Sequence, residues 1–393
     1  MENNNDNKVL NVPPLRFPEF SGEWDSFKLV ELGKFIGGGT PSSSNLSFWT
    51  GSIPWISSSD IKEDNINNIS ISRYITEEAI EKSATKYCPA PVILIVSRVG
   101  VGKVALSHTS LCTSQDFCNI IEIKCHPVFL SYNLLRTMKR KSREVQGTSI
   151  KGITSDELQK MRVFIPKNKD EQNKISNLLT LLDERIATQN KIIEDLKKLK
   201  CAIIEKLYSK IQGKEYSYGQ LFDVVNERNK QMEYSNILSA SQEKGMVNRD
   251  DLNLDIQFER SNINTYKIVR KGDYVIHLRS FQGGFAFSDK LGVCSPAYTI
   301  LRPNSLLEYS YLSYYFTSRR FIKSLIIVTY GIRDGRSINV EEWLNMKVVI
   351  PSKEHQLHTL NVLKRIDDKV ENEEKYATCL SNQKQYLLRQ MFI

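Results

Sequence analysis

The sequence has 393 residues, which is enough for two or three domains that each bury a core. Its hydrophobic fraction of 40% is ordinary for a globular protein, and no apolar run approaches the length of a membrane span, so we expect no membrane association. The net charge of +9 favours a polyanionic partner without proving one. Seven cysteines without CxxC pairs predict free thiols in a reducing, cytoplasmic compartment and no metal site.

The first half of the chain predicts a mixed α/β domain behind a short tail. Residues 1–20 lack the apolar stretch of a secretory signal and are expected to form a disordered or extended tail. The polar stretch "GGGTPSSSNLSFWTGSIPWISSSDI" is long and irregular, and its tryptophans favour a functional loop over disorder. Buried strands are predicted at "VILIVSRVG" and "CNIIEIK", and a helix around "VFLSYNLLRTMKRK".

A long charged helix follows, and the whole arrangement then occurs a second time. The first helix starts within "IPKNKDEQNKISNLLTLLDERI", a stretch that begins at Ile165. Its copy starts within "IPSKEHQLHTLNVLKRIDDKV", a stretch that begins at Ile350. Between them lie strand patterns at "DYVIHLRS" and "AYTILRP" and a helical pattern at "YSYLSYYFTSRRFIKSL". Matching positions in the two copies include Gln172 with Gln356, Leu179 with Leu363, Asp183 with Asp367, Arg98 with Arg279, and "LSYNLL" with "LSYYF". The chain is therefore two copies of one unit.

The repeat predicts an α+β fold in which two pseudo-repeated mixed α/β domains are joined by two long antiparallel helices that form a coiled-coil spacer. The expected boundaries are a tail at 1–20, a first domain at 21–165, a central helix at 166–212, a second domain at 213–350 and a C-terminal helix at 351–393.

Both helices carry apolar residues at heptad spacing over about five heptads, which is typical of a coiled-coil seam. Two polar residues interrupt each stripe at matching places, Gln189 and Lys200 in one helix and Glu373 and Lys384 in the other. An antiparallel register that places Gln189 opposite Lys384 and Lys200 opposite Glu373 matches polar with polar throughout. We predict that register.

The two units, each closing with a sequence like "IPKNKDEQNKISNLLTLLDERI", resemble the specificity subunit of type I restriction-modification enzymes over about residues 20 to 393. The stretches "LGKFIGGGTPSSSNLSFWTGSIPWISSSDI" and "GVCSPAYTILRP" resemble target recognition domains of that family. The resemblance implies a subunit without catalytic activity whose two domains each read half of a bipartite, asymmetric site in double-stranded DNA. It also implies two adenine methyltransferase subunits, which bind S-adenosylmethionine, and motor-nuclease subunits as partners, with no cofactor on this chain.

Base reading requires Arg or Lys toward guanine and Asn or Gln toward adenine, on elements that reach a groove. In the first domain the candidates are Thr40, Ser42, Ser43, Ser57, Ser58, Ser59, Asp60, Arg98, Lys103, Thr148, Ser149 and Lys151, with Lys139, Arg140 and Lys141 assigned to phosphates. In the second domain they are Ser241, Gln242, Arg279, Gln282, Tyr330, Arg333 and Arg336. For Arg98 and Arg279, a structural ion pair with a carboxylate is the alternative.

Two other functions remain open from the sequence. Asp116, Glu122 and Lys124 form an acid followed by Glu-x-Lys, which is typical of a metal-dependent endonuclease, although the matching "SPAYTILRP" lacks these residues. A coiled-coil scaffold whose domains bind proteins is the second alternative. A fused restriction-methylation enzyme with other partners would use a chain of the same appearance.

Overall fold

The computed structural model describes residues 10–145, 152–241, 244–251, 260–277, 284–330 and 337–393. The chain divides into two compact units, one of Met1–Asn190 with Lys375–Ile393 and the other of Lys191–Glu374. Each unit mixes helices and strands, as the sequence predicted. Among the described helices, none combines the length and the apolar character that a membrane span requires.

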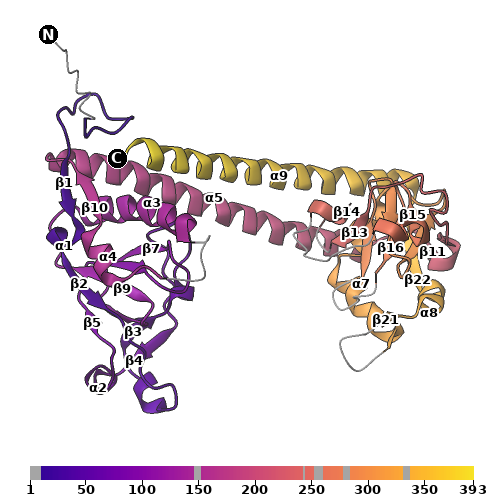
Figure 1. Ribbon diagram of the computed structural model, residues 1–393. Coiled ribbons are helices and arrows are strands. Elements are labelled where there is room, and N and C mark those ends of the chain that lie inside the picture. The colour runs from indigo at the N-terminus through magenta and orange to yellow at the C-terminus, as the bar shows by residue number, and fades with distance from the viewer. Residues whose placement is uncertain (1–9, 146–151, 242–243, 252–259, 278–283, 331–336) are drawn as a thin grey trace, which may run out of the picture. The chain divides into compact units, whose positions relative to one another are not determined.

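Two four-stranded sheets form the centre of the first unit (Figure 1). One has the order β2-β9-β6-β7 and the other the order β4-β3-β8-β5, while β1 pairs with β10. The strands are β1 (Asp25–Lys28), β2 (Lys34–Gly37), β3 (Ile53–Ile56), β4 (Arg73–Ile75), β5 (Tyr87–Cys88), β6 (Val92–Val96), β7 (Val104–Ser107), β8 (Leu111–Thr113), β9 (Phe117–Ile121) and β10 (Arg162–Ile165). Every residue of β6 and β9 is buried, which confirms the two strands predicted there.

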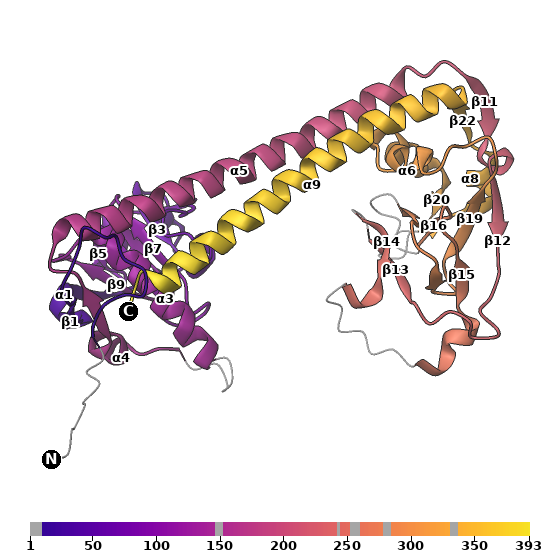
Figure 2. The same ribbon diagram turned by 90° about the horizontal axis from the view of Figure 1, so that it is seen from above.

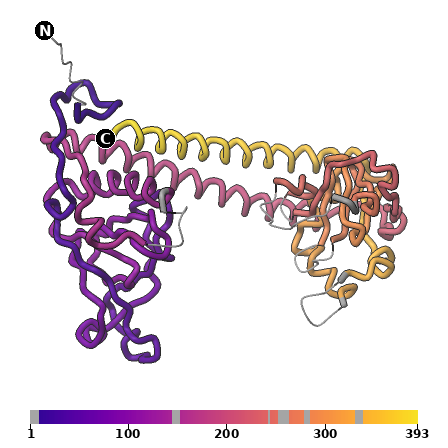
Figure 3. Tube along the Cα trace, viewed as in Figure 1, coloured from indigo at the N-terminus to yellow at the C-terminus, as the bar shows by residue number. Residues whose placement is uncertain are grey.

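Helices α1 (Leu29–Leu32), α3 (Pro127–Val145), α4 (Ser155–Lys160) and the first part of α5 (Lys169–Ser209) pack on the first of these sheets, with α3 against β7. Helix α2 (Glu77–Glu81) packs instead beside the second sheet, where Ala79 contacts the core around Trp55 and Ile75. The last turns of the C-terminal helix α9 (Lys353–Gln390) belong to the same unit, as Figure 3 traces in yellow. Phe392 packs there against Trp24 and Phe129. The core therefore unites residues from both ends of the chain.

Residues 10–20 form no helix or strand, yet they are attached to the first unit. Arg16 donates from Nε and Nη2 to the two carboxylate oxygens of Glu171 at 2.7 and 2.8 Å. The backbone N–H of Leu15 donates to the carbonyl of Gln390 at 2.9 Å. This part of the expected tail is thus extended and anchored to the first turn of α5 and the end of α9.

The second unit repeats one four-stranded sheet and one strand pair of the first unit, which together we call the frame. Its four-stranded sheet has the order β12-β19-β16-β17, the same pattern as β2-β9-β6-β7, and β11 pairs with β22 as β1 pairs with β10. The strands are β11 (Lys214–Ser217), β12 (Phe222–Val225), β13 (Leu238–Ser241), β14 (Gly245–Asn248), β15 (Lys267–Val269), β16 (Tyr274–Ile276), β17 (Phe285–Phe287), β18 (Gly292–Cys294), β19 (Thr299–Pro303), β20 (Thr329–Tyr330), β21 (Ser337–Ile338) and β22 (Lys347–Ile350). Away from the frame, β13 pairs with β14, β15 with β18 and β20 with β21, so the copies differ in their outer parts.

The helices of the second unit differ from the prediction at one point. They are the last part of α5, α6 (Tyr311–Tyr315), α7 (Arg319–Ser324), α8 (Val340–Asn345) and the first part of α9. The single helical pattern predicted over "YSYLSYYFTSRRFIKSL" breaks into α6 and α7 because Ser318 leaves the helical conformation and caps α7, accepting from the N–H of Phe321 at 3.2 Å.

Within each unit α5 and α9 lie side by side and antiparallel (Figure 2). The polar pairs predicted for them are wrong for both lysines. Lys384 donates to Asp183 in the first unit, and Lys200 forms an ion pair with Asp367 in the second. Asp183 and Asp367 stand six residues before the expected partners Gln189 and Glu373. The heptad stripe does not reveal this offset, because a tyrosine from each globular part holds the aspartate in place.

Candidate nucleic-acid interface

One edge of the β2-β9-β6-β7 sheet collects most of the described candidate residues of the first unit. The strands are antiparallel, and Gly37 at the end of β2 pairs with Cys118, while Val96 at the end of β6 pairs with Phe117. Because β7 begins opposite the end of β6, the turn from Arg98 to Lys103 also lies at this edge. Ser97, which precedes Arg98, donates through its backbone N–H to the carbonyl of Asp116 at 2.8 Å. The topology therefore brings Arg98 and Lys103 next to the segment that leads into β9.

A cavity of about 640 Å³ opens at this edge. It is lined by Gly37, Gly38, Ser97, Arg98, Val99, Gln115, Phe117, Cys118, Gly152, Ile153, Thr154 and Ser155. A Cβ atom at Gly152 would lie 2.5 Å from the carbonyl oxygen of Ser97, so only glycine allows this close approach. Burial raises the pKa of the Cys118 thiol, which leaves it a neutral part of the wall. Arg98 is exposed and is a cation at the cavity rim.

The turn between β6 and β7 needs two glycines and rests on α3. Gly100 and Gly102 have φ values of +88° and +112°, a backbone conformation that side chains with a Cβ rarely adopt. A Cβ at Gly102 would lie 3.1 Å from the side chain of Ser142 on α3. The turn carrying Arg98 and Lys103 thus lies directly on the helix that carries the basic cluster Lys139–Arg143.

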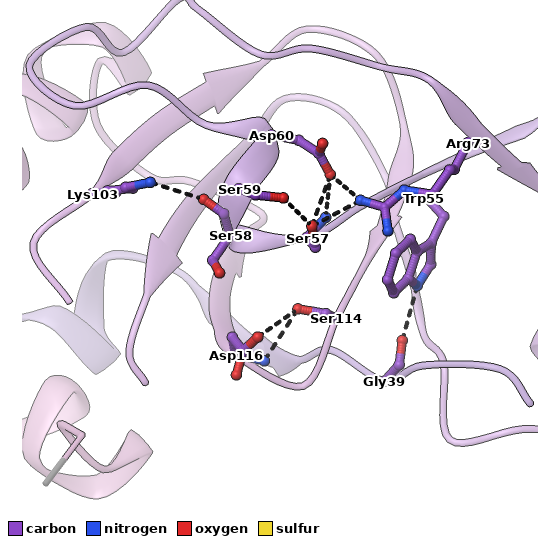
Figure 4. A network of polar contacts seen from close by, with 10 residues as sticks. All are labelled: Gly39, Trp55, Ser57, Ser58, Ser59, Asp60, Arg73, Lys103, Ser114 and Asp116. Atoms are coloured by element: carbon purple, nitrogen blue, oxygen red, sulfur yellow. Dashed lines mark hydrogen bonds and ion pairs between the residues drawn. The ribbon is translucent and has the colours of Figure 1, made fainter. Parts of the chain in front are cut away.

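The segment Ser57–Asp60 meets the same edge from the second sheet (Figure 4). It follows β3, and Lys103 Nζ donates to the carbonyl of Ser58 at 3.1 Å. Asp60 Oδ2 accepts from the Ser57 N–H at 2.7 Å and forms an ion pair with Arg73. Arg73 also lies over the Trp55 ring, 4.5 Å from its centroid. The carboxylate of Asp60 is therefore engaged in shaping the turn, whereas Ser58 and Ser59 complete its outer surface.

The loop of Thr40, Ser42 and Ser43 is exposed and starts from two closely packed glycines. A Cβ at Gly38 would lie 2.0 Å from the carbonyl oxygen of Ser114, and the carbonyl of Gly39 accepts from Trp55 Nε1 at 3.0 Å. Thr40 Oγ1 donates to the side-chain oxygen of Gln115. The tryptophans that argued against disorder therefore hold this loop in place.

Sequence reasoning missed two residues of the site, Arg73 and Gln115. Gln115 is exposed, lines the cavity and is of the residue type that reads adenine. It lay inside the "SQDF" segment that aligns the two copies, so its type and place gave a usable signal. Nothing in the sequence indicated Arg73, because its role depends on the pairing of β4 with β3.

The basic residues of α3 divide into two kinds. Lys139 Nζ donates to both carboxylate oxygens of Asp64 at 2.7 and 2.9 Å, so its charge is balanced within the fold. Arg140 is exposed, and Lys141 is half-buried. Thr148, Ser149 and Lys151 lie outside the described residues.

Most candidates of the second unit also lie outside the described residues, namely Gln242, Arg279, Gln282, Arg333 and Arg336. Ser241 ends β13, where its Oγ accepts from the Lys244 N–H at 3.4 Å. Tyr330 ends β20. The strand β16 occupies in its sheet the position that β6 occupies in the first sheet.

The residues of the alternative nuclease site do not converge. Asp116 precedes β9 and Glu122 follows it, so about 20 Å of extended strand separates them. Glu122 forms an ion pair with Lys34 at 3.6 Å, at the far edge of the sheet. Within the described part of the chain, no three His, Cys, Asp or Glu side chains group in a way that could hold a metal ion. The Asp116/Glu122/Lys124 hypothesis is therefore wrong.

Comparisons with known proteins show which proteins the chain is similar to. Residues 21–198 match the family model of the type I restriction modification DNA specificity domain. The MjaIX specificity subunit of Methanocaldococcus jannaschii is 31% identical over 213 residues, covering 51% of this chain and 48% of that protein. The EcoR124I/EcoR124II specificity subunit of Escherichia coli is 35% identical over 177 residues, covering 43% of each. The match thus spans about half the length of these relatives.

Two solved structures share the fold over nearly the whole chain. A chain from a study of complex assembly and conformational transition of the type I R-M system has a TM-score of 0.61 at 15% identity and covers 93% of this chain and 96% of its own. The type I restriction-modification S subunit from M. genitalium has a TM-score of 0.53 at 16% identity, with 97% and 99% covered. At these identities the likeness concerns the fold alone.

Proposed function

We propose that this chain, whose residues 21–198 match the type I restriction modification DNA specificity domain, recognises a bipartite DNA sequence, one half with each unit. In this proposal the chain performs no catalysis. Its partners are double-stranded DNA, two adenine methyltransferase subunits and motor-nuclease subunits, which implies a cytoplasmic location. The methyltransferase subunits, not this chain, bind S-adenosylmethionine.

The observation that carries the proposal is the convergence of polar segments at one sheet edge. Five segments distant in sequence meet there, around Gly38–Ser43, Ser57–Asp60, Arg98–Lys103, Ser114–Asp116 and Gly152–Ser155. They offer hydroxyl, amide and guanidinium groups, which are the groups that read base edges. Tight glycine contacts and the buried Trp55 fix these segments, so the side chains are held in place before DNA arrives.

Within this edge we assign two kinds of contact. Arg98 and Gln115, both exposed at the cavity, read bases, with Thr40 orienting the Gln115 amide. Arg140 contacts phosphate, because it is exposed on the helix under the Arg98–Lys103 turn. Lys139 is withdrawn from the phosphate set, since Asp64 already neutralises it.

The two long helices are the proposed spacer. A repeated frame with different outer strands suits a pair of readers that recognise different half-sites. The paired helices α5 and α9 set the gap between those half-sites and offer a docking surface to the methyltransferase subunits. Half-site separation is then a property of protein geometry, as it is for other two-part DNA readers.

Two substitutions separate the proposed roles. In the complex with its methyltransferase, Arg98→Ala is expected to cost about 1–3 kcal/mol of binding and to relax the preference at one base pair. Arg140→Ala is expected to weaken binding to every sequence and to lower the slope of log affinity against log salt by about one. Fluorescence anisotropy with labelled duplexes, at several salt concentrations, measures both.

The matched control is Arg162→Ala, because Arg162 is an exposed arginine on β10 bonded to Ser26 and not at the edge described above. Its affinity and salt slope should equal those of the unchanged protein. Loss of affinity for one sequence alone in Arg140→Ala would overturn its phosphate role. Unchanged discrimination in Arg98→Ala would overturn the assigned base contact, and a complex that fails to bind any duplex would overturn the function.

A further inference from the structure

A buried ion pair joins α5 and α9 in the first unit. Lys384 Nζ donates to Asp183 Oδ1, and the two side chains are only 3% and 4% exposed. Tyr132 on α3 donates its hydroxyl to the other carboxylate oxygen of Asp183 at 2.8 Å, and Lys384 Nζ lies 5.5 Å from the centroid of the Tyr132 ring. Three helices therefore meet in this group, which we call the first triad (Tyr132, Asp183, Lys384).

The second unit contains the same group in matching positions. Tyr314 donates its hydroxyl to Asp367 Oδ2 at 2.7 Å, Lys200 forms an ion pair with Oδ1 of the same carboxylate, and Lys200 Nζ lies 5.2 Å from the Tyr314 ring centroid. This second triad (Tyr314, Asp367, Lys200) is related to the first by the repeat, because Tyr314 stands in "LSYYF" where Tyr132 stands in "LSYNLL". Asp367 and Lys384 each follow their counterparts in α5 by the same number of residues.

The lysine of each triad comes from the opposite copy of the repeat. The first copy supplies Tyr132 and Asp183 and receives Lys384 from the second. The second copy supplies Tyr314 and Asp367 and receives Lys200 from the first. Each ion pair therefore joins the helix of one copy to the helix of the other.

Because the first triad is buried, each of its charges requires a partner of opposite charge. Burial raises the pKa of Asp183 and lowers the pKa of Lys384, which means that the surroundings disfavour each charge in the absence of its partner. A displacement of α9 by one heptad would move Lys384 about 10 Å along α5 and leave both charges buried and unpaired. The apolar stripes alone would accept that displacement, since a heptad step again places apolar residues opposite one another.

We propose that the two triads are the positioning residues that fix the register of α5 against α9. The inference deepens the proposed function, on which its second consequence rests: a fixed register means a single gap between the two half-sites. In the first unit, Lys384 Nζ also donates to the carbonyl of Asp64 at 2.6 Å, four residues past the Ser57–Asp60 segment. The same lysine thus connects the helix register to a loop of the proposed reader.

Spin labels in the first unit test the register without DNA. One label is attached to the native, exposed Cys379. The other is attached to a cysteine that replaces the exposed Asn173 on α5 (Asn173→Cys), and Cys201→Ser removes the other exposed thiol. The unchanged triad should give one narrow distance distribution by double electron–electron resonance. The apolar variant Asp183→Leu with Lys384→Met removes the charges without leaving one unpaired, so it should fold and should show additional distances displaced by about 10 Å.

Two further variants control this result. The exchanged pair Asp183→Lys with Lys384→Asp restores opposite charges and should restore the single distribution. Lys197→Gln with Glu374→Gln removes an ion pair between the same helices that is 55% and 47% exposed, and it should leave the distribution unchanged. An apolar variant with the original single distribution would overturn the proposal.

The second triad provides an independent test if the apolar variant of the first fails to fold. Its Lys200 and Asp367 are 28% and 37% exposed, so Asp367→Leu with Lys200→Met removes less buried charge. Labels on native Cys201 and on Glu354→Cys, in a Cys379→Ser background, report the second unit. A broadened distribution supports the proposal, and an unchanged one contradicts it.

Methylation sequencing in cells that express the chain with its methyltransferase adds the functional consequence. The unchanged chain should methylate sites with one gap length, and the apolar variant of the first triad should also methylate sites with other gaps. Displaced distances together with no methylation by the unchanged chain would uphold the register and refute the proposed function. Methylation at one gap by both chains would refute the proposal while upholding the function.

Discussion

Gln172 and Gln356 hold the start of the two long helices in the same way. Gln172 Nε2 donates to the carbonyl of Pro166 at 2.9 Å, and its side-chain oxygen accepts from the His126 N–H at 3.0 Å. Gln356 donates to the carbonyl of Pro351 at 3.1 Å and accepts from the Glu308 N–H at 2.8 Å. Both are buried, so each amide replaces water for backbone groups that would otherwise lack a partner.

Replacing Gln172 by alanine should therefore destabilise the junction of β10 and α5. We expect the free energy of local unfolding at the first turns of α5 to fall by about 1–3 kcal/mol, because the carbonyl of Pro166 and the N–H of His126 are left unpaired. Hydrogen exchange followed by mass spectrometry measures this. Gln159→Ala is the control, since that half-buried side chain donates to the exposed Ser155 hydroxyl rather than to a buried backbone group, and its loss should change the value by less than about 0.5 kcal/mol. Equal protection in the two variants would contradict the assignment.

By exposure the cysteines divide into two exposed, one half-buried and four buried thiols. Cys201 and Cys379 are exposed, whereas burial raises the pKa of Cys88 to about 11 and that of Cys112 and Cys294 to about 12. At pH 8 we expect two thiols to react rapidly with a chromogenic disulfide reagent and all seven to react in denaturant. The double variant Cys201→Ser with Cys379→Ser should show no rapid phase. More than two rapid thiols in the native protein would contradict the packing described.

The raised pKa values of these buried thiols determine whether the free energy of unfolding rises or falls with pH. Their pKa values in the folded state lie above the unfolded value of about 8.5. Their contribution to stability is therefore complete below about pH 8.5 and is lost as the pH rises through about 11 to 12. Alkaline conditions expose and ionise these buried groups together.

Among the helices and strands, hydrophobic periodicity predicted the elements correctly, whereas the polar pairs predicted between α5 and α9 were wrong for both lysines. The repeat and the buried patterns predicted β6, β9, β19 and the long helices, because burial imposes a period that the sequence displays. The heptads indicated which faces of α5 and α9 meet. They did not reveal the partners of Lys200 and Lys384, since each aspartate is selected by a tyrosine distant in sequence.

At the sheet edge proposed to read DNA, the sequence likewise did not reveal which side chains are already paired within the fold. Sequence reasoning found Arg98, Lys103 and Ser57–Asp60 from residue type and from their places after buried strands. It could not separate groups that face solvent from those already occupied, such as Asp60 on Arg73 and Lys139 on Asp64. Those distinctions depend on pairing between β3 and β4 and on packing of α3, which no local pattern carries.

Across the whole molecule, one arrangement of strands occurs in both units. The sheets β2-β9-β6-β7 and β12-β19-β16-β17 share one strand order, while the strands outside them differ between the copies. Each copy also contributes one lysine to the other through the triads. This division between a constant frame and variable outer parts predicts that one unit can be exchanged without disturbing what the other reads.

Methylation sequencing of DNA from cells that express the chain with its methyltransferase tests whether each unit reads one half of a bipartite DNA site. Cells lacking the chain provide the background, and a chimera with residues 21–165 replaced by the matching domain of a relative provides the comparison. We predict a new asymmetric motif of two halves around one gap, of which the chimera changes one half only. The same methylation with and without the chain, or a motif that the chimera leaves whole, would contradict it.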